Sequence, residues 1–447
     1  MASNILKRVK PVEKLDDKEW GESIQLLETT FGKDWLGNAT SHNPLCLLWQ
    51  KTDFFAQQEL FTLSSAIKIM NNIDRVWVRN KIKEIKGKDI NNCRGALFEL
   101  IGASYFSKDD QQVIPAKNNN PGVDMQINFS NGNKINWSMK NYGISAHQRD
   151  FNANFLDCED LLKAHLIHNK ITSLQIVITF MKYPASADWK EIKKNIPQIL
   201  QAYVMNKNLS VQNYRIPPLA LFSLCPLSEY ENLNFSMSSY IFIGWSPYHD
   251  NEHKNLLDKL DEACANLCKY AKSQDVKEVN GIYIHLHSSA LINDCQKWID
   301  DYFSNHPDSP ISYILLHQPT LTRNLENNTS NITHCVKFIS NTLSNDWLKE
   351  LQHSIQLVVP FGIVSENLSN QTLVSGDIQI PISGFYIQQT GNIYTDCIIK
   401  SDGSTEGHIS NIASGIKQHC FLKFPGQNQS VMISDKVFPK EDELTIL

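Results

Sequence analysis

Long apolar runs are missing from this sequence of 447 residues. No stretch of about 18 consecutive apolar residues occurs, which is the length that a membrane-spanning helix requires. The first ten residues, MASNILKRVK, also lack the apolar centre of a secretory signal peptide. These absences predict a cytoplasmic protein that makes no membrane contact.

Paired cysteines of the kind that bind zinc are missing as well. The ten cysteines are scattered and form no Cys-x-x-Cys motif, so a reducing compartment explains them without disulfides. Cys264 and Cys268 are one helical turn apart, and His285 and His287 alternate along an expected strand. Core packing therefore explains these pairs better than a zinc site does.

The motifs of two other enzyme classes are also absent. Neither a Gly-x-Ser-x-Gly elbow nor a Gly-x-x-x-x-Gly-Lys-Ser/Thr loop occurs in the chain. The sequence therefore argues against a serine hydrolase and against a nucleotide-driven motor.

A global excess of positive charge is absent too. The chain has 42 Lys and Arg against 47 Asp and Glu, a net charge of −5, so nucleic-acid binding would depend on local patches. The candidate patch is a basic run of Arg75, Arg79, Lys81, Lys83, Lys86, Lys88 and Arg94. These side chains either follow phosphates or form a solvated helix face. Trp77 is expected to be a buried anchor rather than a base-stacking residue.

What is present is the composition of a folded protein, with 42% hydrophobic and 20% charged residues. The length suits three domains. We predict a helical N-terminal region in 1–90, an α/β domain in 91–340 with a mixed sheet flanked by helices, and a β-rich domain in 341–447. The expected strands of the α/β domain are 113–115, 124–129, 134–140, 174–181, 219–224, 240–245, 281–286 and 311–316, with helices at 251–273 and 291–305.

Two further segments complete this prediction. The polar segment 320–333 has no regular period and predicts a loop or domain boundary. Beyond residue 354, short strands broken by turn residues are expected at 355–361, 378–382, 384–388, 393–399 and 420–424.

The informative motif begins on an apolar helix. Glu99 lies among Leu97, Leu100 and Ile101, where an ionised carboxylate is costly unless it has a partner or a metal ion. The carboxylate of Glu99 is therefore expected to point into a polar cavity or solvent.

A hairpin follows the helix, because Asn131-Gly132 separates two segments of alternating polarity. A three-residue loop with Gly132 in the left-handed conformation pairs Phe129 with Asn133, and it places Asp124 opposite Ser138 on the face of Lys140. A two-residue loop would send Ser138 and Lys140 to the other face. Only the three-residue loop builds a site.

These residues resemble the restriction endonuclease-like PD-(D/E)XK superfamily over about residues 91–181. The resemblance implies that Asp124 and Glu99 bind magnesium or manganese, that the backbone carbonyl of Met139 adds a ligand, and that Lys140 orients or activates water. Gln148 and Arg149 follow the motif strand, where a helix can deliver a phosphate contact.

Ser138 departs from the family pattern, which has Asp or Glu at this position. A hydroxyl supplies neither the charge nor the bidentate reach of a carboxylate, so a weaker metal site is expected. Magnesium is often held by only one or two carboxylates with waters and substrate oxygens, so Asp124 and Glu99 can suffice.

The sequence thus predicts a magnesium-dependent endonuclease that cleaves DNA in a restriction, defence or mobile-element role. One alternative is a catalytically silent nuclease-like module that binds nucleic acid or protein, and another is a nuclease that cleaves RNA. Cutting both strands with one site per chain would favour a homodimer, and a partner subunit of a defence or transposition system is the other expected association.

Overall fold

The structure is a computed structural model of the whole chain. The residues that it describes are 10–11, 15–38, 41–51, 54–108, 111–116, 122–143, 145–171, 173–206, 211–226, 239–244, 249, 251–270, 278–287, 290, 292–324, 329–341, 355–365, 370–375, 378–383, 388–390, 393–399, 405–411, 421–423, 430–432 and 444–447.

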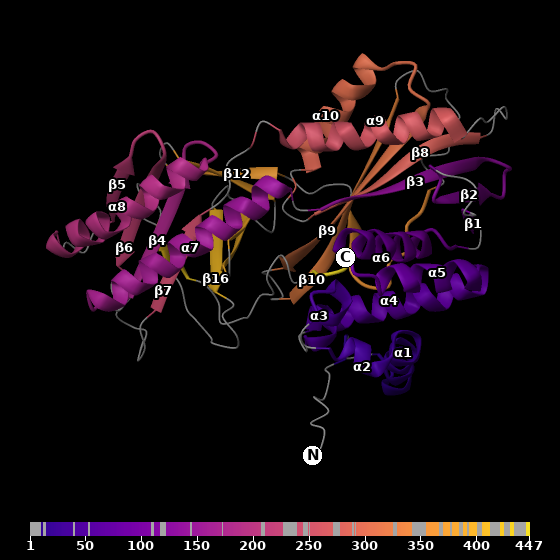
Figure 1. Cartoon of the computed structure of the whole chain (residues 1–447), viewed down its shortest axis with the longest axis horizontal. Helices are drawn as coiled ribbons and strands as arrows, with labels where there is room; N and C mark the ends of the chain where they lie inside the picture. Colours follow the sequence, from indigo (N-terminus) through magenta and orange to yellow (C-terminus); the bar gives the residue numbers. More distant parts are fainter. Residues whose placement is uncertain are drawn as a thin grey trace.

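A seven-stranded mixed sheet forms the centre of the molecule (Figure 1). Its order is β1-β2-β3-β8-β9-β10-β11. Strands β3, β8 and β9 are parallel, whereas β1, β2 and β3 form an antiparallel meander and β9 pairs with β10 in antiparallel fashion. The strands are β1 (Gln111–Pro115), β2 (Met125–Phe129), β3 (Lys134–Tyr142), β8 (Glu278–Leu286), β9 (Ile311–Asn324), β10 (Thr329–Ser340) and β11 (Ile363–Ser365).

One face of this sheet is covered by the N-terminal helices, as predicted for a helical region before the motif (Figure 1). Asp74 and Asp89 begin two of these helices by accepting backbone N–H groups with their side chains. Apolar residues such as Leu60, Leu63 and Ile67 recur every three or four positions and join one buried core. The helices are α1 (Asp17–Phe31), α2 (Lys33–Leu36), α3 (Pro44–Gln50), α4 (Phe54–Ile73), α5 (Arg75–Ile85) and α6 (Ile90–Tyr105).

The opposite face is covered by α9 (Glu252–Tyr270) and α10 (Ile292–Asn305). Leu256, Leu260 and Leu267 of α9 are fully buried against Ile282 and Ile284 of β8. The central part is therefore a three-layer arrangement of helices, sheet and helices.

A second α/β lobe is inserted between β3 and β8. It has its own buried core and a four-stranded sheet of order β5-β6-β4-β7, so the predicted α/β region contains two sheets. Its elements are α7 (Ala146–His168), β4 (Ser173–Phe180), α8 (Ser186–Met205), β5 (Gln212–Ile216), β6 (Ala220–Pro226) and β7 (Ser239–Gly244).

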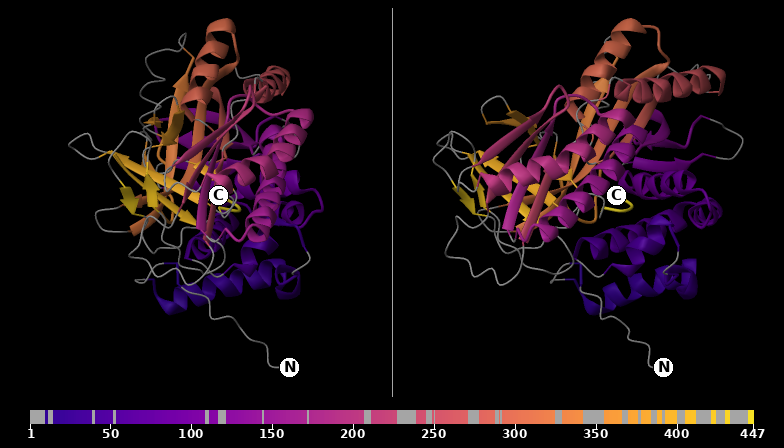
Figure 2. Two further views of the ribbon diagram at one scale, coloured as in Figure 1. Left: turned by 90° about the vertical axis from the view of Figure 1, so that its left-hand side faces the viewer. Right: turned by 60° about the vertical axis from the view of Figure 1, so that its left-hand side comes forward.

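The described residues of the C-terminal region form short strands, some of which contact other parts of the chain. Strands β14 and β15 contact β7 of the inserted lobe (Figure 2), and β11 joins the central sheet. Residues 444–447 return to α4, where the buried Glu59 accepts the backbone N–H groups of Ile446 and Leu447 at 2.8 and 3.0 Å. The remaining strands are β12 (Asn370–Ser375), β13 (Ile378–Ser383), β14 (Gln388–Thr390), β15 (Ile393–Ile399), β16 (Thr405–Asn411), β17 (Phe421–Lys423) and β18 (Ser430–Met432).

A line of buried hydrogen bonds holds the segment before β11 to the sheet. Tyr283 Oη lies 2.7 Å from His317 Nδ1, His317 Nε2 lies 2.9 Å from His334 Nδ1, and His334 Nε2 lies 3.0 Å from the carbonyl oxygen of Phe361. Because a carbonyl only accepts, Nε2 of His334 carries a proton. The same reasoning then places protons on Nε2 of His317 and on the Tyr283 hydroxyl, so every group in the line is satisfied.

Two predictions about segments were wrong. Residues 320–324 and 329–333 belong to β9 and β10 rather than to a loop, because cross-strand pairing over twelve residue pairs stabilises their Thr and Asn residues in extended form. Residues 355–361 form no strand. The segment contacts α6 instead, where the Val358 N–H donates to the Tyr105 carbonyl at 2.8 Å.

The α/β class and the mixed sheet flanked by helices are confirmed. Within the described ranges, no helix combines the length and apolarity needed to cross a bilayer.

Candidate active site

The hairpin between β2 and β3 has the register predicted from its turn. Phe129 donates its N–H to the Asn133 carbonyl at 2.9 Å, and Gly132 has a φ of 85°. Met125 consequently pairs with Trp137, and Asp124 follows where this pairing ends, with its N–H also bonded to the Trp137 carbonyl. The three-residue loop is confirmed.

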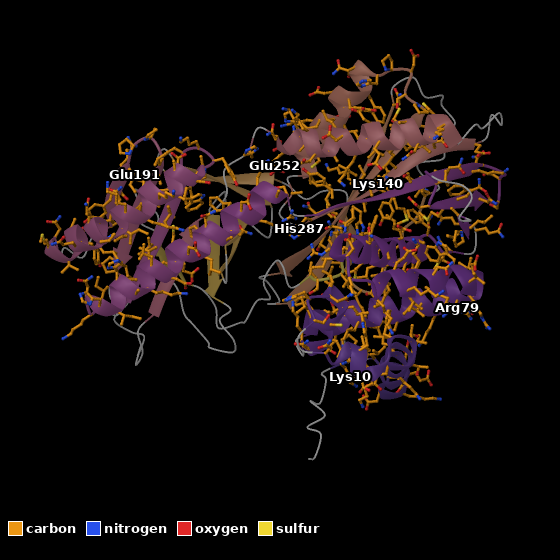
Figure 3. The ribbon with its side chains drawn as sticks, in the orientation of Figure 1. Lys10, Arg79, Lys140, Glu191, Glu252 and His287 are labelled. Atoms are coloured by element: carbon orange, nitrogen blue, oxygen red, sulfur yellow. The ribbon has the colours of Figure 1, made fainter. Side chains whose placement is uncertain are left out.

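Residues on β3 alternate between the two faces of the sheet. Ser138 and Lys140 pair with Ile282 and Ile284 of β8, which pack beneath α9 and α10. Met139 pairs with Tyr283 and points to α6. Lys140 therefore lies on the α9 side of the central sheet (Figure 3), on the same face as Ser138, as predicted.

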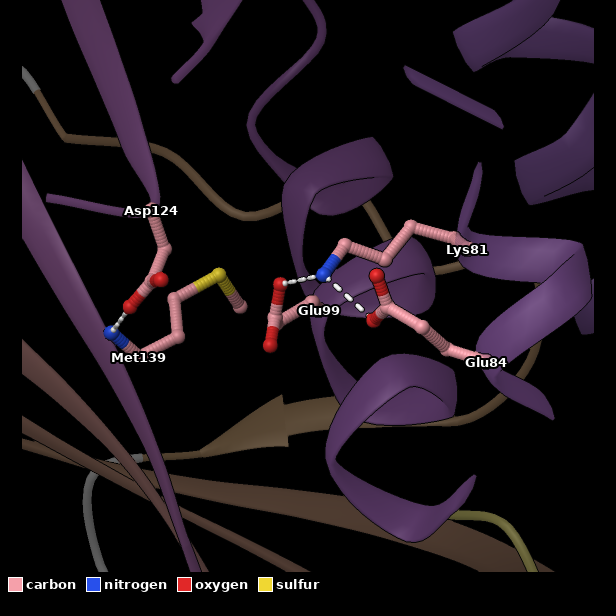
Figure 4. Close-up of polar contacts among 5 residues, drawn as sticks. All are labelled: Lys81, Glu84, Glu99, Asp124 and Met139. Carbon is pink, nitrogen blue, oxygen red and sulfur yellow. Dashed lines mark hydrogen bonds and ion pairs between the residues drawn. The ribbon is translucent and has the colours of Figure 1, made fainter. Parts of the chain in front are cut away.

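Asp124 occupies the fork where β2 ends beside β3. Its backbone N–H donates to the Trp137 carbonyl at 2.8 Å, and its side-chain Oδ2 accepts the backbone N–H of Met139 at 2.6 Å. The carboxylate thus replaces the strand partner that Met139 would otherwise have (Figure 4). Asp124 thus lies between Glu99, which comes from the α6 face of the sheet, and Lys140, which lies on the α9 face.

The same geometry directs a carbonyl into the fork. In an extended strand, the N–H and C=O of one residue point to the same neighbouring strand. Because the N–H of Met139 points to Asp124, its carbonyl points to the same side, beyond the end of β2. The predicted third ligand therefore lies beside the predicted carboxylate.

Glu99 reaches this fork from α6. Its Oε2 lies 2.6 Å from Lys81 Nζ, and that ammonium also contacts Glu84 Oε2 at 2.8 Å. The side chains of Lys81 and Glu99 are only 13% and 20% exposed, so the ion pair is largely shielded from solvent. Figure 4 shows the carboxylates of Glu99 and Asp124 on facing sides of the Met139 side chain.

The two acids disfavour each other's charge. Burial, and secondly the negative charge of Asp124, raise the pKa of Glu99 to about 7, although Lys81 opposes this shift. Burial also raises the pKa of Asp124, against the Met139 N–H and the positive charges of Lys140 and Lys81. The ionised form of each acid is therefore disfavoured in this site, and a cation bound between the two carboxylates would stabilise it.

The donor set fits a magnesium ion that keeps several waters. Asp124 and Glu99 supply two carboxylates and Met139 a carbonyl, which are the hard oxygen ligands that magnesium prefers. Among the described residues, no group of three or more His, Cys, Asp or Glu side chains is arranged to hold a metal. A site of this kind would thus depend on substrate oxygens to complete its coordination.

Ser138 fills the position of the missing acid without a strong contact. Its side chain is 1% exposed, and its Oγ has no hydrogen-bond partner of good geometry among the described residues. The Ser138 side chain lies close enough to Asp124 to lower the pKa of that carboxyl group, as the last of the causes that act on it. The hydroxyl is therefore placed to bind a water molecule in the fork.

The predicted basic run divides into two groups. Arg75, Arg79, Lys83 and Lys88 are exposed, so their phosphate contacts remain a prediction. Lys81 is half-buried against Glu99. Lys86 is exposed, but it donates to the Phe31 carbonyl at 2.8 Å and lies 5.3 Å from the Trp35 ring centre. Trp77 is 8% exposed, which confirms its predicted role as a buried anchor.

The remaining predicted contacts lie at the start of α7. Arg149 is exposed there, whereas the side chain of Gln148 lies outside the described residues. Cys268 is exposed on α9, so the expectation of a core position for it was wrong, while Cys264 is half-buried.

The contact between Lys81 and Glu99 is the functional feature that the sequence did not reveal. Lys81 and Glu84 are three residues apart on α5, a spacing that indicates an ion pair on one helix face. Nothing in that spacing shows that the same face packs on α6. Comparisons with models of known protein families and with curated proteins found no match to this chain.

Proposed function

We propose that this chain is a metal-dependent endonuclease with a restriction endonuclease-like core. The observation that carries the proposal is the position of Asp124, whose carboxylate accepts the Met139 N–H at 2.6 Å in the fork of the hairpin. Glu99 faces it from α6, and Lys140 follows on β3. A helix acid, an acid at the start of one hairpin strand and a lysine on the next strand form the pattern of the PD-(D/E)XK superfamily.

Asp124, Glu99 and the Met139 carbonyl would hold the magnesium ion. Magnesium bound there supplies positive charge that stabilises the negative charge developing on the scissile phosphate. Lys140 positions and polarises the attacking water for in-line displacement. Ser138 binds a water through its free hydroxyl, and Lys81 holds the Glu99 carboxylate toward the fork.

The test is an incubation of the purified chain with plasmid, linear duplex DNA, single-stranded DNA and RNA. Each substrate is offered with magnesium, with manganese and with chelator. Cleavage that needs the metal and is confined to one substrate class establishes the enzyme and names its substrate, with DNA expected. An absence of cleavage on every substrate with either metal would contradict the proposal.

A second candidate is a catalytically silent module that binds nucleic acid or protein. Two observations favour it: Ser138 replaces an acid, and Lys81 already neutralises Glu99. Ser138→Glu separates the candidates, with Ser138→Ala as the control for loss of the hydroxyl. Activity gained only by Ser138→Glu indicates a silent site, whereas an active wild type excludes this candidate.

A further inference from the structure

A second polar cluster lies near the amino end of α6, away from the two acids. Arg94 is half-buried there, and its Nε is completely buried without a hydrogen-bond partner among the described residues. None of the ion pairs in the described part of the chain includes Arg94. A buried guanidinium without a carboxylate is costly, and an anionic ligand removes that cost.

The neighbours of Arg94 are basic rather than acidic. Burial lowers the pKa of Arg94, and the positive charge of Arg149 on α7 lowers it further. Burial, and then the charge of Arg94, also lower the pKa of His285 to about 4. His287 is affected in the same direction by burial, His285 and Arg94. Both histidines are therefore neutral near pH 7, and the positive charge that acts on Arg94 is that of Arg149.

The cluster is built on rigid elements. The His285 ring lies 5.2 Å from the Phe98 ring of α6, and its Nδ1 lies 3.1 Å from Asn141 Oδ1 of β3. These residues stand at the carboxyl ends of the parallel strands β3 and β8, beside the labelled His287 (Figure 3). In open α/β sheets, ligands commonly bind outside the carboxyl ends of the strands.

We propose that Arg94 and Arg149, with His285 lining the site, bind an oxyanion, namely a phosphate of the nucleic-acid strand that enters the Asp124 fork. The identity of the strand rests on the proposed function. Arg94 and Glu99 are five residues apart on α6, a rise of about 7.5 Å and a rotation of about 140° about the helix axis, so Arg94 can contact the same strand only at a phosphate other than the one held at Glu99. A guanidinium whose Nε has no partner among the described residues suits a phosphate, because the planar guanidinium can bind a phosphate bidentately.

The chemistry excludes a cation as the ligand. Both arginines repel a metal ion, and no carboxylate stands among the residues that perturb Arg94. The site therefore differs from the fork around Asp124, which attracts cations. Together the two sites would hold a metal ion and a second phosphate of the strand being cleaved.

The test measures binding in chelator, so that no cleavage or metal bridging contributes. A labelled single-stranded oligonucleotide is titrated into the wild type, Arg94→Gln, Arg94→Lys and the control Arg215→Gln, an exposed arginine on β5. Arg94→Gln should weaken binding at least about tenfold and reduce the salt slope by about 1. Arg94→Lys should be intermediate, and Arg215→Gln should match the wild type.

A second measurement separates this site from a structural role. Without ligand, Arg94→Gln should melt at the same or a higher temperature than the wild type, because it removes an uncompensated charge. Inorganic phosphate should raise the melting temperature of the wild type but not of Arg94→Gln. A clearly lower melting temperature of unliganded Arg94→Gln, or an equal phosphate effect on both proteins, would overturn the proposal.

The outcomes also distinguish this proposal from the nuclease proposal. Asp124→Asn should lose cleavage but keep the phosphate effect, because Asp124 is not part of this cluster. If the wild type binds inorganic phosphate but not the oligonucleotide, the proposal that the ligand is a nucleic-acid strand is wrong, whatever the cleavage assay gives.

Discussion

Lys81 Nζ lies 2.6 Å from Glu99 Oε2, joining two helices that have separate sequence patterns. The contact places the Lys81 ammonium on the carboxylate that we propose as a metal ligand. Lys81 favours the ionised form of Glu99, and it would compete with the proposed metal ion for the same carboxylate.

Removing Lys81 should destabilise the protein. Lys81→Met leaves the buried Glu99 without its partner, at an expected cost of about 1–3 kcal/mol in the free energy of unfolding. Glu99→Gln in the same chain should recover part of this loss, because the unpaired charge is gone. Urea unfolding of the two single variants and the double variant measures the coupling. Lys83→Met, an exposed lysine on the same helix, is the control, and an equal loss in that variant would refute the buried ion pair.

Metal binding should depend on pH through Glu99. Its pKa of about 7 means that it must release a proton before it binds a cation. Affinity for manganese should therefore rise about fivefold between pH 6 and pH 7, reach about tenfold by pH 8 and level off above it. Calorimetry in two buffers of different ionisation enthalpy measures the released proton. Glu99→Gln should bind more weakly and lose this pH dependence; an unchanged profile would exclude Glu99 as a ligand.

The raised pKa of Glu99 has the opposite effect on folding stability, which should fall as the pH rises. Because the pKa of Glu99 is raised in the folded state, its contribution to stability is complete below about pH 4.5 and is lost as the pH rises to about 7. Glu99→Gln should therefore gain stability relative to the wild type as the pH increases over this window.

The buried histidines should destabilise the protein in acid. Burial lowers the pKa of His334 to about 4, so the folded state resists protonation that the unfolded chain accepts near pH 6.5. Stability should fall as the pH decreases from about 6.5 to about 4. Nitrogen-15 NMR should find the proton of His334 and of His317 on Nε2, as the contact of His334 with the Phe361 carbonyl requires. A proton on Nδ1 of either ring would contradict the hydrogen-bond directions assigned from Tyr283 to the Phe361 carbonyl.

Two glycines of α6 should respond in opposite directions to alanine. A Cβ on Gly102 would lie 2.7 Å from Met139 Cε and 2.8 Å from Tyr283 Cε1, so Gly102→Ala should cost about 1–3 kcal/mol. Gly95 has open space at that position, and Gly95→Ala should stabilise the helix by about 0.5–1 kcal/mol. Thermal unfolding compares them. A gain in Gly102→Ala would show that α6 does not pack closely on β3.

The parts of the site that could be predicted are those fixed by local turn geometry. The Asn131-Gly132 turn sets the register of its own hairpin, so the relation between Asp124 and β3 follows from residues within about 15 positions. The position of Glu99 on an apolar helix also restricts where its carboxylate can point. These features needed no knowledge of distant contacts.

Features that depend on distant pairing could not be predicted. The partner of Lys81 depends on how α5 packs against α6, and charge spacing does not contain that information. The polar residues 320–324 and 329–333 form strands because β9 and β10 pair with each other. Likewise, nothing in the residues near Glu59 indicates that it binds the backbone of residues 446 and 447.

The most direct test of the nuclease site compares cleavage rates of the wild type, Asp124→Asn, Lys140→Met and Lys134→Met in magnesium and in chelator. Lys134 is a lysine at the start of the same strand, so its variant controls for loss of one positive charge. Asp124→Asn and Lys140→Met should each lose at least about 100-fold in rate while remaining folded, and Lys134→Met should cleave like the wild type. Cleavage that persists in Asp124→Asn, or in chelator, would contradict a metal-dependent site in the fork.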